Sequence, residues 1–167
     1  VLFLKIYDLS MEGHVDHLLS SCGSSLYALR LLRAHGMQEE ELQEVFRSKV
    51  LSRLMYASQA WWGFAQSHRN STMETTSHTI NRIQAFINKS KRFGYCSQSC
   101  EPFITMCEQA DDNLFKQIAT HENHVLYHLI PKPKTHDHYV RIRSHNFQLP
   151  IKDNRNFINR CLFKGIS

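Results

Sequence analysis

The stretch that decides the fold runs from His14 to Phe64 and reads HVDHLLSSCGSSLYALRLLRAHGMQEEELQEVFRSKVLSRLMYASQAWWGF. In its first half, apolar residues recur three and four positions apart, which predicts one buried face of a helix. That face comprises Val15, Leu18, Leu19, Cys22, Leu26, Leu29 and Leu32. Gly36 is placed to end this helix.

A second helix is expected from about Gln38, because three consecutive glutamates suit the first turn of a helix and an apolar stripe follows them. The stripe comprises Leu42, Val45, Phe46, Val50, Leu54 and Ala57. Two long helices joined by a short turn that contains glycine form an αα-hairpin. The hairpin is therefore the predicted centre of the fold.

After the hairpin, a polar loop is expected at 67–77, followed by a third amphipathic helix from about Thr79 to Arg92. Two shorter helices are expected at Pro102–Cys107 and Ala110–Thr120, and a strand or its remnant at Val1–Leu9. The predicted fold class is mainly α: an αα-hairpin, a third amphipathic helix and short helices, with an extended basic C-terminal tail. The expected divisions are 1–13 (remnant strand or junction), 14–94 (helical domain), 95–130 (short-helix region) and 131–167 (tail).

The net charge of +5 is unevenly distributed along the chain. Residues 1–130 hold 12 basic and 13 acidic side chains, whereas residues 131–167 hold 8 basic and 2 acidic ones. This pattern indicates a near-neutral body and a basic tail that is extended or disordered unless something binds it. Two interpretations of the tail stay open: it tracks a phosphate backbone, or it is solvated and docks weakly on the body.

Composition also bears on the compartment. No apolar run approaches the ~20 residues of a membrane span. The five cysteines are odd in number and lack the spacing of a disulfide framework, which favours a reducing environment. We therefore expect an intracellular protein of the nucleus, the cytoplasm or both, with no membrane partner. The chain does not begin with methionine, so we also expect a fragment.

The sequence QADD at 109–112 invites comparison with paired catalytic aspartates that hold metal ions. Such a pair lies on a tight turn between two apolar strands, whereas Leu114, Phe115 and Ile118 follow here at helical spacing. We therefore interpret Asp111 and Asp112 as acids of a helix's first turn and predict no catalytic residue.

The cysteines at 96, 100 and 107, followed by His121 and His124, offer ligand types that suit zinc. Structural zinc sites usually show two close pairs of ligands, which this spacing lacks, and Phe103, Ile104 and Met106 place Cys107 on an apolar helix face. The spacing favours packed thiols over a metal site. Whether Cys96, Cys100 and Cys107 bind zinc is left open by the sequence.

Several segments together resemble one family. They are His14–Met37, Leu42–Phe64, FINKSKRFGYC at 86–96, EQADDNLFKQI at 108–118, NHVLYHLIP at 123–131 and His145–Ser167. In this order they are similar to the C-terminal end of reverse transcriptases from LINE-type (non-LTR) retrotransposons. The resemblance implies a thumb at 14–94 and a post-thumb region beyond it, following a catalytic palm that this chain lacks.

The parent family is RNA-directed DNA polymerase, which uses magnesium in its palm. The resemblance therefore implies no cofactor in this chain, no polymerase activity for it alone, and RNA and DNA of a template–primer as partners. The alternative is a small helical interaction module, or an inactive transposon relic, without nucleic-acid function.

Basic side chains are the candidates for nucleic-acid contact, because cations displace the counterions condensed on a phosphate backbone. They are Arg30, Arg33, Arg47, Lys49, Arg53, Lys89, Lys91, Arg92, Arg141 and Arg143. Aromatic residues at 61, 62, 64, 93 and 95 lie among them in sequence and could stack on bases. The other interpretation is that these cations are solvated and that the tryptophans belong to the core.

Overall fold

The computed structural model describes residues 11–66, 78–133 and 146–164. In these ranges the chain is mainly α-helical, as predicted, and contains no β-strand. The elements in chain order are α1 (Met11–Ala34), α2 (Glu39–Val45), the π-helix η1 (Phe46–Leu51), α3 (Ser52–Met55), α4 (Ser58–Gln66), α5 (His78–Arg92), α6 (Phe103–Thr120), the 3-10 turn η2 (Tyr127–Leu129) and α7 (Phe157–Phe163). The predictions for Val1–Leu9, Ser67–Ser77, Arg141 and Arg143 fall outside the described residues.

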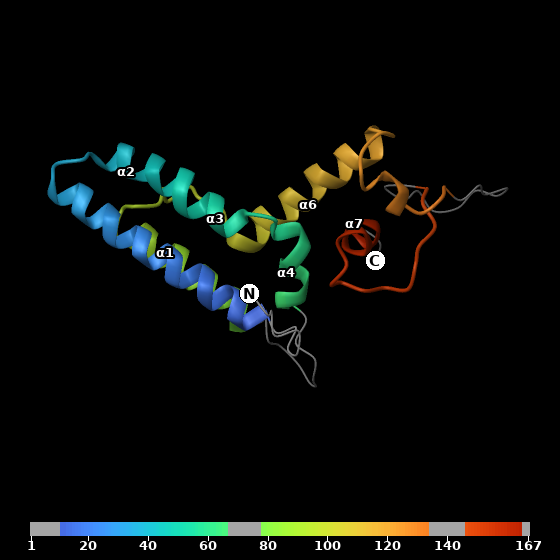
Figure 1. Ribbon diagram of the computed structural model, residues 1–167, viewed down its shortest axis with the longest axis horizontal. Coiled ribbons are helices and arrows are strands. Elements are labelled where there is room, and N and C mark those ends of the chain that lie inside the picture. Colours follow the sequence, from blue (N-terminus) through green and yellow to red (C-terminus); the bar gives the residue numbers. More distant parts are fainter. Residues whose placement is uncertain (1–10, 67–77, 134–145, 165–167) are drawn as a thin grey trace, which may run out of the picture.

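The predicted αα-hairpin is confirmed. α1 forms one arm, and α2, η1 and α3 form the antiparallel second arm (Figure 1). Gly36 in the turn has a φ of +93°, a conformation that glycine adopts at little cost. Leu42, Phe46, Val50 and Leu54 are all at most 1% exposed, so the apolar stripe of the second arm faces the core. α1 begins at Met11, slightly earlier than the sequence suggested.

The second arm is less regular than predicted. Its middle is the π-helix η1, in which the amide of Ser52 donates to the carbonyl of Arg47. The arm ends where Ala57 adopts a φ of +49°, which a right-handed helix cannot accommodate. The expectation that Ala57 continues the apolar stripe is therefore wrong. α4 starts immediately after this break and leaves the hairpin in a new direction (Figure 1).

α5 is the predicted third helix, and it packs along α1. Near the starts of the two helices, Arg82 pairs with Asp16 at 2.5 Å. At the opposite end, the Arg33 guanidinium lies over the ring of Tyr95, just beyond α5, at 4.3 Å. The two helices are therefore parallel. The α5 stripe (Ile80, Ile83 and Ile87) is at most 1% exposed, and such burial contributes about 1.5–3 kcal/mol per side chain.

α6 corrects two predictions. It is one helix of 18 residues rather than two shorter ones, since neither Gly nor Pro interrupts it between Cys107 and Ala110. Asp111 and Asp112 consequently lie in its middle, so the interpretation of them as first-turn acids is wrong. The start of α6 belongs to the core: Phe103 is fully buried and stacks on Trp61 with 6.0 Å between ring centroids. The rest of α6 extends beyond the hairpin (Figure 1).

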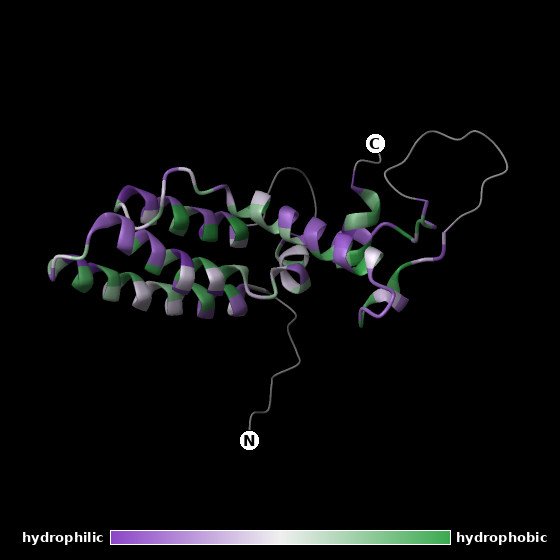
Figure 2. Cartoon of the chain, turned by 90° about the horizontal axis from the view of Figure 1, so that it is seen from above, coloured by the Kyte–Doolittle hydropathy of each residue, from purple (hydrophilic) through white to green (hydrophobic). Residues whose placement is uncertain are grey.

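The prediction of an extended or disordered tail is wrong for Phe157–Phe163, which form α7, whereas 146–156 contain no helix or strand. The alternative, that the tail docks on the body, agrees with the packing of α7. Residues 146–164 return to the body, where α7 contacts α4 and α6. The Asn156 side chain caps α7 by accepting from the amide of Asn159, and Cys161 and Leu162 are buried. Colouring by hydropathy shows apolar and polar residues mixed along each helix, as expected of amphipathic elements (Figure 2). Within the described ranges, no helix combines the length and apolar character needed to cross a membrane.

Candidate nucleic-acid interface and the anchor of the C-terminal segment

The candidate cations of the body lie on three helical segments of one bundle. Arg30 and Arg33 come from the end of α1, and three α5 residues come from the corresponding end of that parallel helix: Lys89, Lys91 and Arg92. Parallel packing of α1 and α5 therefore gathers five cations at one end of the bundle. α2 begins at the same end, so the Glu39 carboxyl group also lies there, and both it and the Arg33 guanidinium adjoin Gly94. The other candidate cations lie along the second arm of the hairpin: Arg47, Lys49 and Arg53.

Three of these cations are engaged within the protein. Arg33 covers the face of Tyr95. The Lys91 ammonium donates to the carbonyl oxygens of Gln98, at 3.3 Å, and of Cys100, at 2.5 Å, and so holds the segment after α5. The Arg53 guanidinium donates to the Ser21 hydroxyl at 2.5 Å and joins the two arms of the hairpin. Structural contacts thus explain part of the basic pattern.

The remaining cations of the body are exposed: Arg30, Arg47, Lys49, Lys89 and Arg92. None of them forms an ion pair with a carboxylate anywhere in the described ranges. An unpaired, exposed cation can approach a phosphate without breaking an existing contact. These five residues are therefore the candidates on the helical body that the structure leaves available.

The aromatic residues divide in the same way. Trp61, Trp62 and Tyr95 are at most 7% exposed, which confirms that the tryptophans belong to the core and leaves none of the three free to stack on a base. Phe64 and Phe93 are 39% and 50% exposed. Phe93 directly follows Arg92 and lies at the cationic end of the bundle, so it is the aromatic side chain best placed for stacking there.

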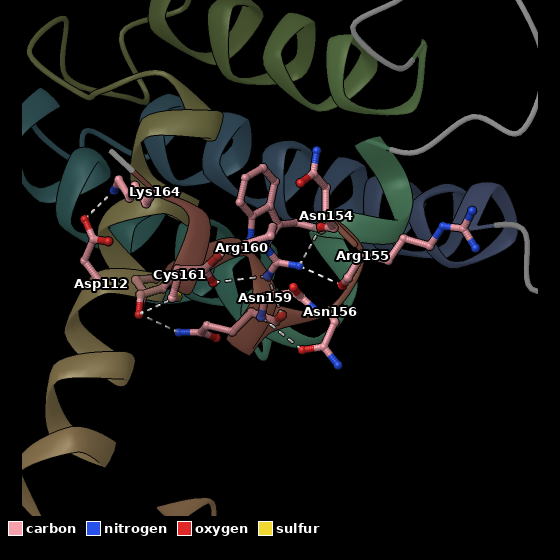
Figure 3. A network of polar contacts seen from close by, with 12 residues as sticks. Asp112, Asn154, Arg155, Asn156, Asn159, Arg160, Cys161 and Lys164 are labelled. Atoms are coloured by element: carbon pink, nitrogen blue, oxygen red, sulfur yellow. Dashed lines mark hydrogen bonds and ion pairs between the residues drawn. The ribbon is translucent and has the colours of Figure 1, made fainter. Parts of the chain in front are cut away.

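The most densely connected polar site is one that the sequence did not single out. The Arg160 side chain, from α7, is 8% exposed and meets the carboxylate of Asp111, from α6, which is 5% exposed. Its Nε donates to Asp111 Oδ2 at 2.9 Å, and its Nη2 lies 3.3 Å from Oδ1. Figure 3 shows Arg160 within this network, together with the neighbouring pair of Asp112 and Lys164. Trp62 Nε1 donates to Asp111 Oδ2 at 3.1 Å. The guanidinium also lies over the Trp62 ring, 4.8 Å from its centroid.

Arg160 also organises the backbone around it. Its Nη1 donates to the carbonyl of Arg155 at 2.8 Å, and its Nη2 donates to that of Gln59 at 2.8 Å. Gly63 makes room for this arrangement: a Cβ there would lie 2.1 Å from Arg160 Nη1 and 2.7 Å from the carbonyl oxygen of Asn154. One side chain therefore ties the C-terminal segment to both α4 and α6.

Burial decides the electrostatics of Asp111. Desolvation raises its pKa, and the hydrogen bonds and charge of Arg160 and the hydrogen bond of Trp62 offset this only in part. The neighbouring Asp112 instead pairs with Lys164 at 2.5 Å, near the surface. Both carboxylates thus form ion pairs with cations of the C-terminal segment, Arg160 on α7 and Lys164 directly after it. They lie on a helix rather than a turn between strands, so they do not fit the magnesium-binding pair of a polymerase palm.

The structure separates the cysteines that the zinc hypothesis joined. Cys96 and Cys100 adjoin one groove beside η1, whereas Cys107 faces α4 and is fully buried. Burial raises the pKa of both Cys96 and Cys107 to about 12, which disfavours the thiolate that zinc requires. Among the residues that the structure describes, no three His, Cys, Asp or Glu side chains gather as a metal site.

Within the sequence, a signal for the anchor does exist. Asn156 precedes Phe157, Ile158, Cys161 and Leu162, which is an N-cap followed by a short apolar helix face. Such a pattern predicts that the segment packs somewhere. It does not reveal that Arg160 points inward, because that depends on a carboxylate 49 residues earlier in the chain.

The fold and this anchor define an all-α helical domain, in the described ranges, whose C-terminal segment is fastened by a buried ion pair. Comparison of the chain with protein-family models, with curated proteins and with solved structures finds no match. Any narrower assignment therefore rests on the residues and on the resemblance described above.

Proposed function

We propose that the chain is the C-terminal, non-catalytic region of a LINE-type RNA-directed DNA polymerase, comprising a thumb and the segment after it. In this role it binds the template–primer duplex and contributes no catalytic residue. The ordered resemblance over residues 14–167 motivates the proposal, and the mainly α fold is compatible with it. The parent enzyme would supply the palm and its magnesium ions.

The observation that carries the proposal is the collection of exposed cations at one end of the bundle. Arg30, Lys89 and Arg92 come from two parallel helices, and none is paired with a carboxylate in the described ranges. A rigid pair of helix ends that presents such cations can contact successive phosphates. Arg141 and Arg143, beyond the described residues, remain part of the same proposal from the sequence.

A salt titration of binding to an RNA–DNA duplex tests this. Affinity should fall steeply between low and physiological salt, with a log–log slope that reflects the number of phosphates contacted. The double variant Arg30→Gln/Lys89→Gln should weaken binding and reduce that slope by about 2. Lys116→Gln/Lys132→Gln, which removes the same charge from exposed positions elsewhere, is the matched control.

The competing interpretation is a helical interaction module without nucleic-acid function, or an inactive relic. The structural engagement of Arg33, Lys91 and Arg53 favours it, since those cations already have roles inside the protein. No binding at low salt, or equal loss in the two double variants, would reject the proposed interface.

A further inference from the structure

A second surface of the bundle has the opposite electrostatic character. A groove of about 410 Å³ runs between α2–η1 on one side and the segment after α5 with the first turns of α6 on the other. This volume lies within the ~300–1,000 Å³ of typical ligand sites. Leu51 and Met106, both half-buried, contribute apolar surface to its lining, and the buried Phe46 lies behind them. Carboxylates also line the groove: Glu40, Glu44 and Glu101.

These carboxylates lack cationic partners. Arg47 is the one Lys or Arg among the residues that line the groove. None of the three glutamates forms an ion pair within the described ranges, and Glu101 only accepts a hydrogen bond from Gln109, at 2.6 Å. With three carboxylates against Arg47, the lining carries an excess of negative groups beside apolar surface, and the Lys91 ammonium approaches the lining where it donates to the carbonyl oxygen of Cys100.

The cavity at the C-terminal anchor provides a comparison, because its aspartates form ion pairs within the chain. It also contains carboxylates, but Arg160 pairs with Asp111 and Lys164 pairs with Asp112. These two ion pairs hold α7, and the other charged groups of the lining, Glu108 and Lys152, are of opposite sign. The groove beside η1 has no comparable internal pairing and is the better candidate for an external ligand.

We propose that this groove is a docking site for a lysine- or arginine-bearing peptide segment of a partner protein. The aliphatic stems of such side chains would lie on Leu51 and Met106, and their charged heads would reach the glutamates. The groove belongs to residues 1–130, which hold 12 basic and 13 acidic side chains, so the surrounding part of the chain carries no positive excess that would repel a cationic peptide. Because three glutamates outnumber Arg47 in its lining, the groove favours a cationic ligand over a phosphate backbone.

Fluorescence anisotropy with a labelled octapeptide of alternating arginine and leucine tests the proposal on the full chain at low salt. Glu40→Gln/Glu44→Gln should weaken binding by about fivefold or more. The control Glu12→Gln/Glu122→Gln changes the net charge equally at exposed positions outside the groove, and it should alter the affinity by less than about twofold. Unchanged helical circular dichroism would show that the variants fold.

Amide chemical shifts should locate the bound peptide along 43–51 and 96–101. The inference is overturned if the wild-type chain does not bind, if both double variants lose affinity equally, or if the shifts cluster around α7. Equal binding of a peptide of alternating glutamate and leucine would also overturn it, because apolar contact alone would then account for the affinity. None of these outcomes depends on whether the chain binds nucleic acid.

Discussion

Replacing Arg160 with methionine removes the guanidinium but keeps a side chain of similar length. The Asp111 carboxylate, 5% exposed, would retain only the indole of Trp62 as a donor among the contacts described above. The carbonyls of Gln59 and Arg155 would lose their Arg160 donors as well. Leaving one member of a buried ion pair without its partner costs about 3–5 kcal/mol.

That cost can be compared with what holds α7 in place. The helix buries two apolar side chains well, Cys161 and Leu162, and such burial stabilises by about 2–4 kcal/mol in total. Since the penalty is at least as large, we expect α7 to leave its site in the Arg160→Met variant rather than remain docked over a bare carboxylate. The measured loss of global stability is then limited by the docking free energy of the segment.

Hydrogen exchange measures this directly, and urea unfolding followed by tryptophan fluorescence gives the global change. Amides of 157–163 should lose protection, while those of α5 keep theirs. Lys164→Met is the control, because its pair with Asp112 is about half exposed and such pairs contribute at most about 1 kcal/mol. Equal protection of α7 in the two variants would refute the assignment of Arg160 as the anchor.

The pH dependence provides an independent check. Burial raises the pKa of Asp111, and in the docked state of the Arg160→Met variant the loss of the guanidinium would raise that pKa further, so protonation of Asp111 favours redocking of α7. A carboxyl group whose pKa is raised on folding stabilises the folded state when it is protonated, and this contribution is lost as the pH rises through the folded-state pKa. The destabilisation by Arg160→Met should therefore shrink on acidification from pH 7 toward pH 4. A constant or growing difference would contradict a buried charge at Asp111.

Three further predictions follow from close contacts and burial. Gly63→Ala should destabilise the docked segment by about 1–3 kcal/mol in urea unfolding, because the added Cβ would lie 2.1 Å from Arg160 Nη1. The control Gly23→Ala should be neutral or stabilising, because its Cβ has no neighbour within 4 Å. Burial lowers the pKa of His14, so stability falls as the pH drops through about 6.5, and His14→Gln should flatten that slope between pH 7.5 and 5.5. Cys107, whose pKa burial raises to about 12, should be alkylated more slowly at pH 8 than the half-buried Cys100, as mass spectrometry can follow.

Local patterns were sufficient for the hairpin and the third helix. Residues such as Leu42, Phe46, Ile83 and Ile87 recur with the helical period, and one buried side is the simplest way to satisfy that period. Gly36 marked the turn for a reason equally local, the positive φ it adopts. The break at Ala57 carries no comparable signal, since alanine is a strong helix former.

The sequence was a poorer guide to the candidate sites than to the helices. The basic pattern named candidate cations, but it could not separate Arg33, whose guanidinium packs on Tyr95, from Arg30 one turn earlier. The sequence likewise placed Glu40 in a helix's first turn without indicating a groove, because the opposite wall comes from residues after α5.

By itself the sequence determined the two arms of the hairpin and α5, with one apolar face on each, because a helix's period depends on residues three and four apart. It did not determine that α6 is continuous or that 157–163 form a helix. Tertiary structure alone decided the role of Asp111. Its partner Arg160 lies 49 positions away, and only the packing of α7 on α4 and α6 excludes water from both charges. The sequence does not distinguish an aspartate that is solvated from one that is buried beside a guanidinium, because the fold determines how much water reaches the carboxylate.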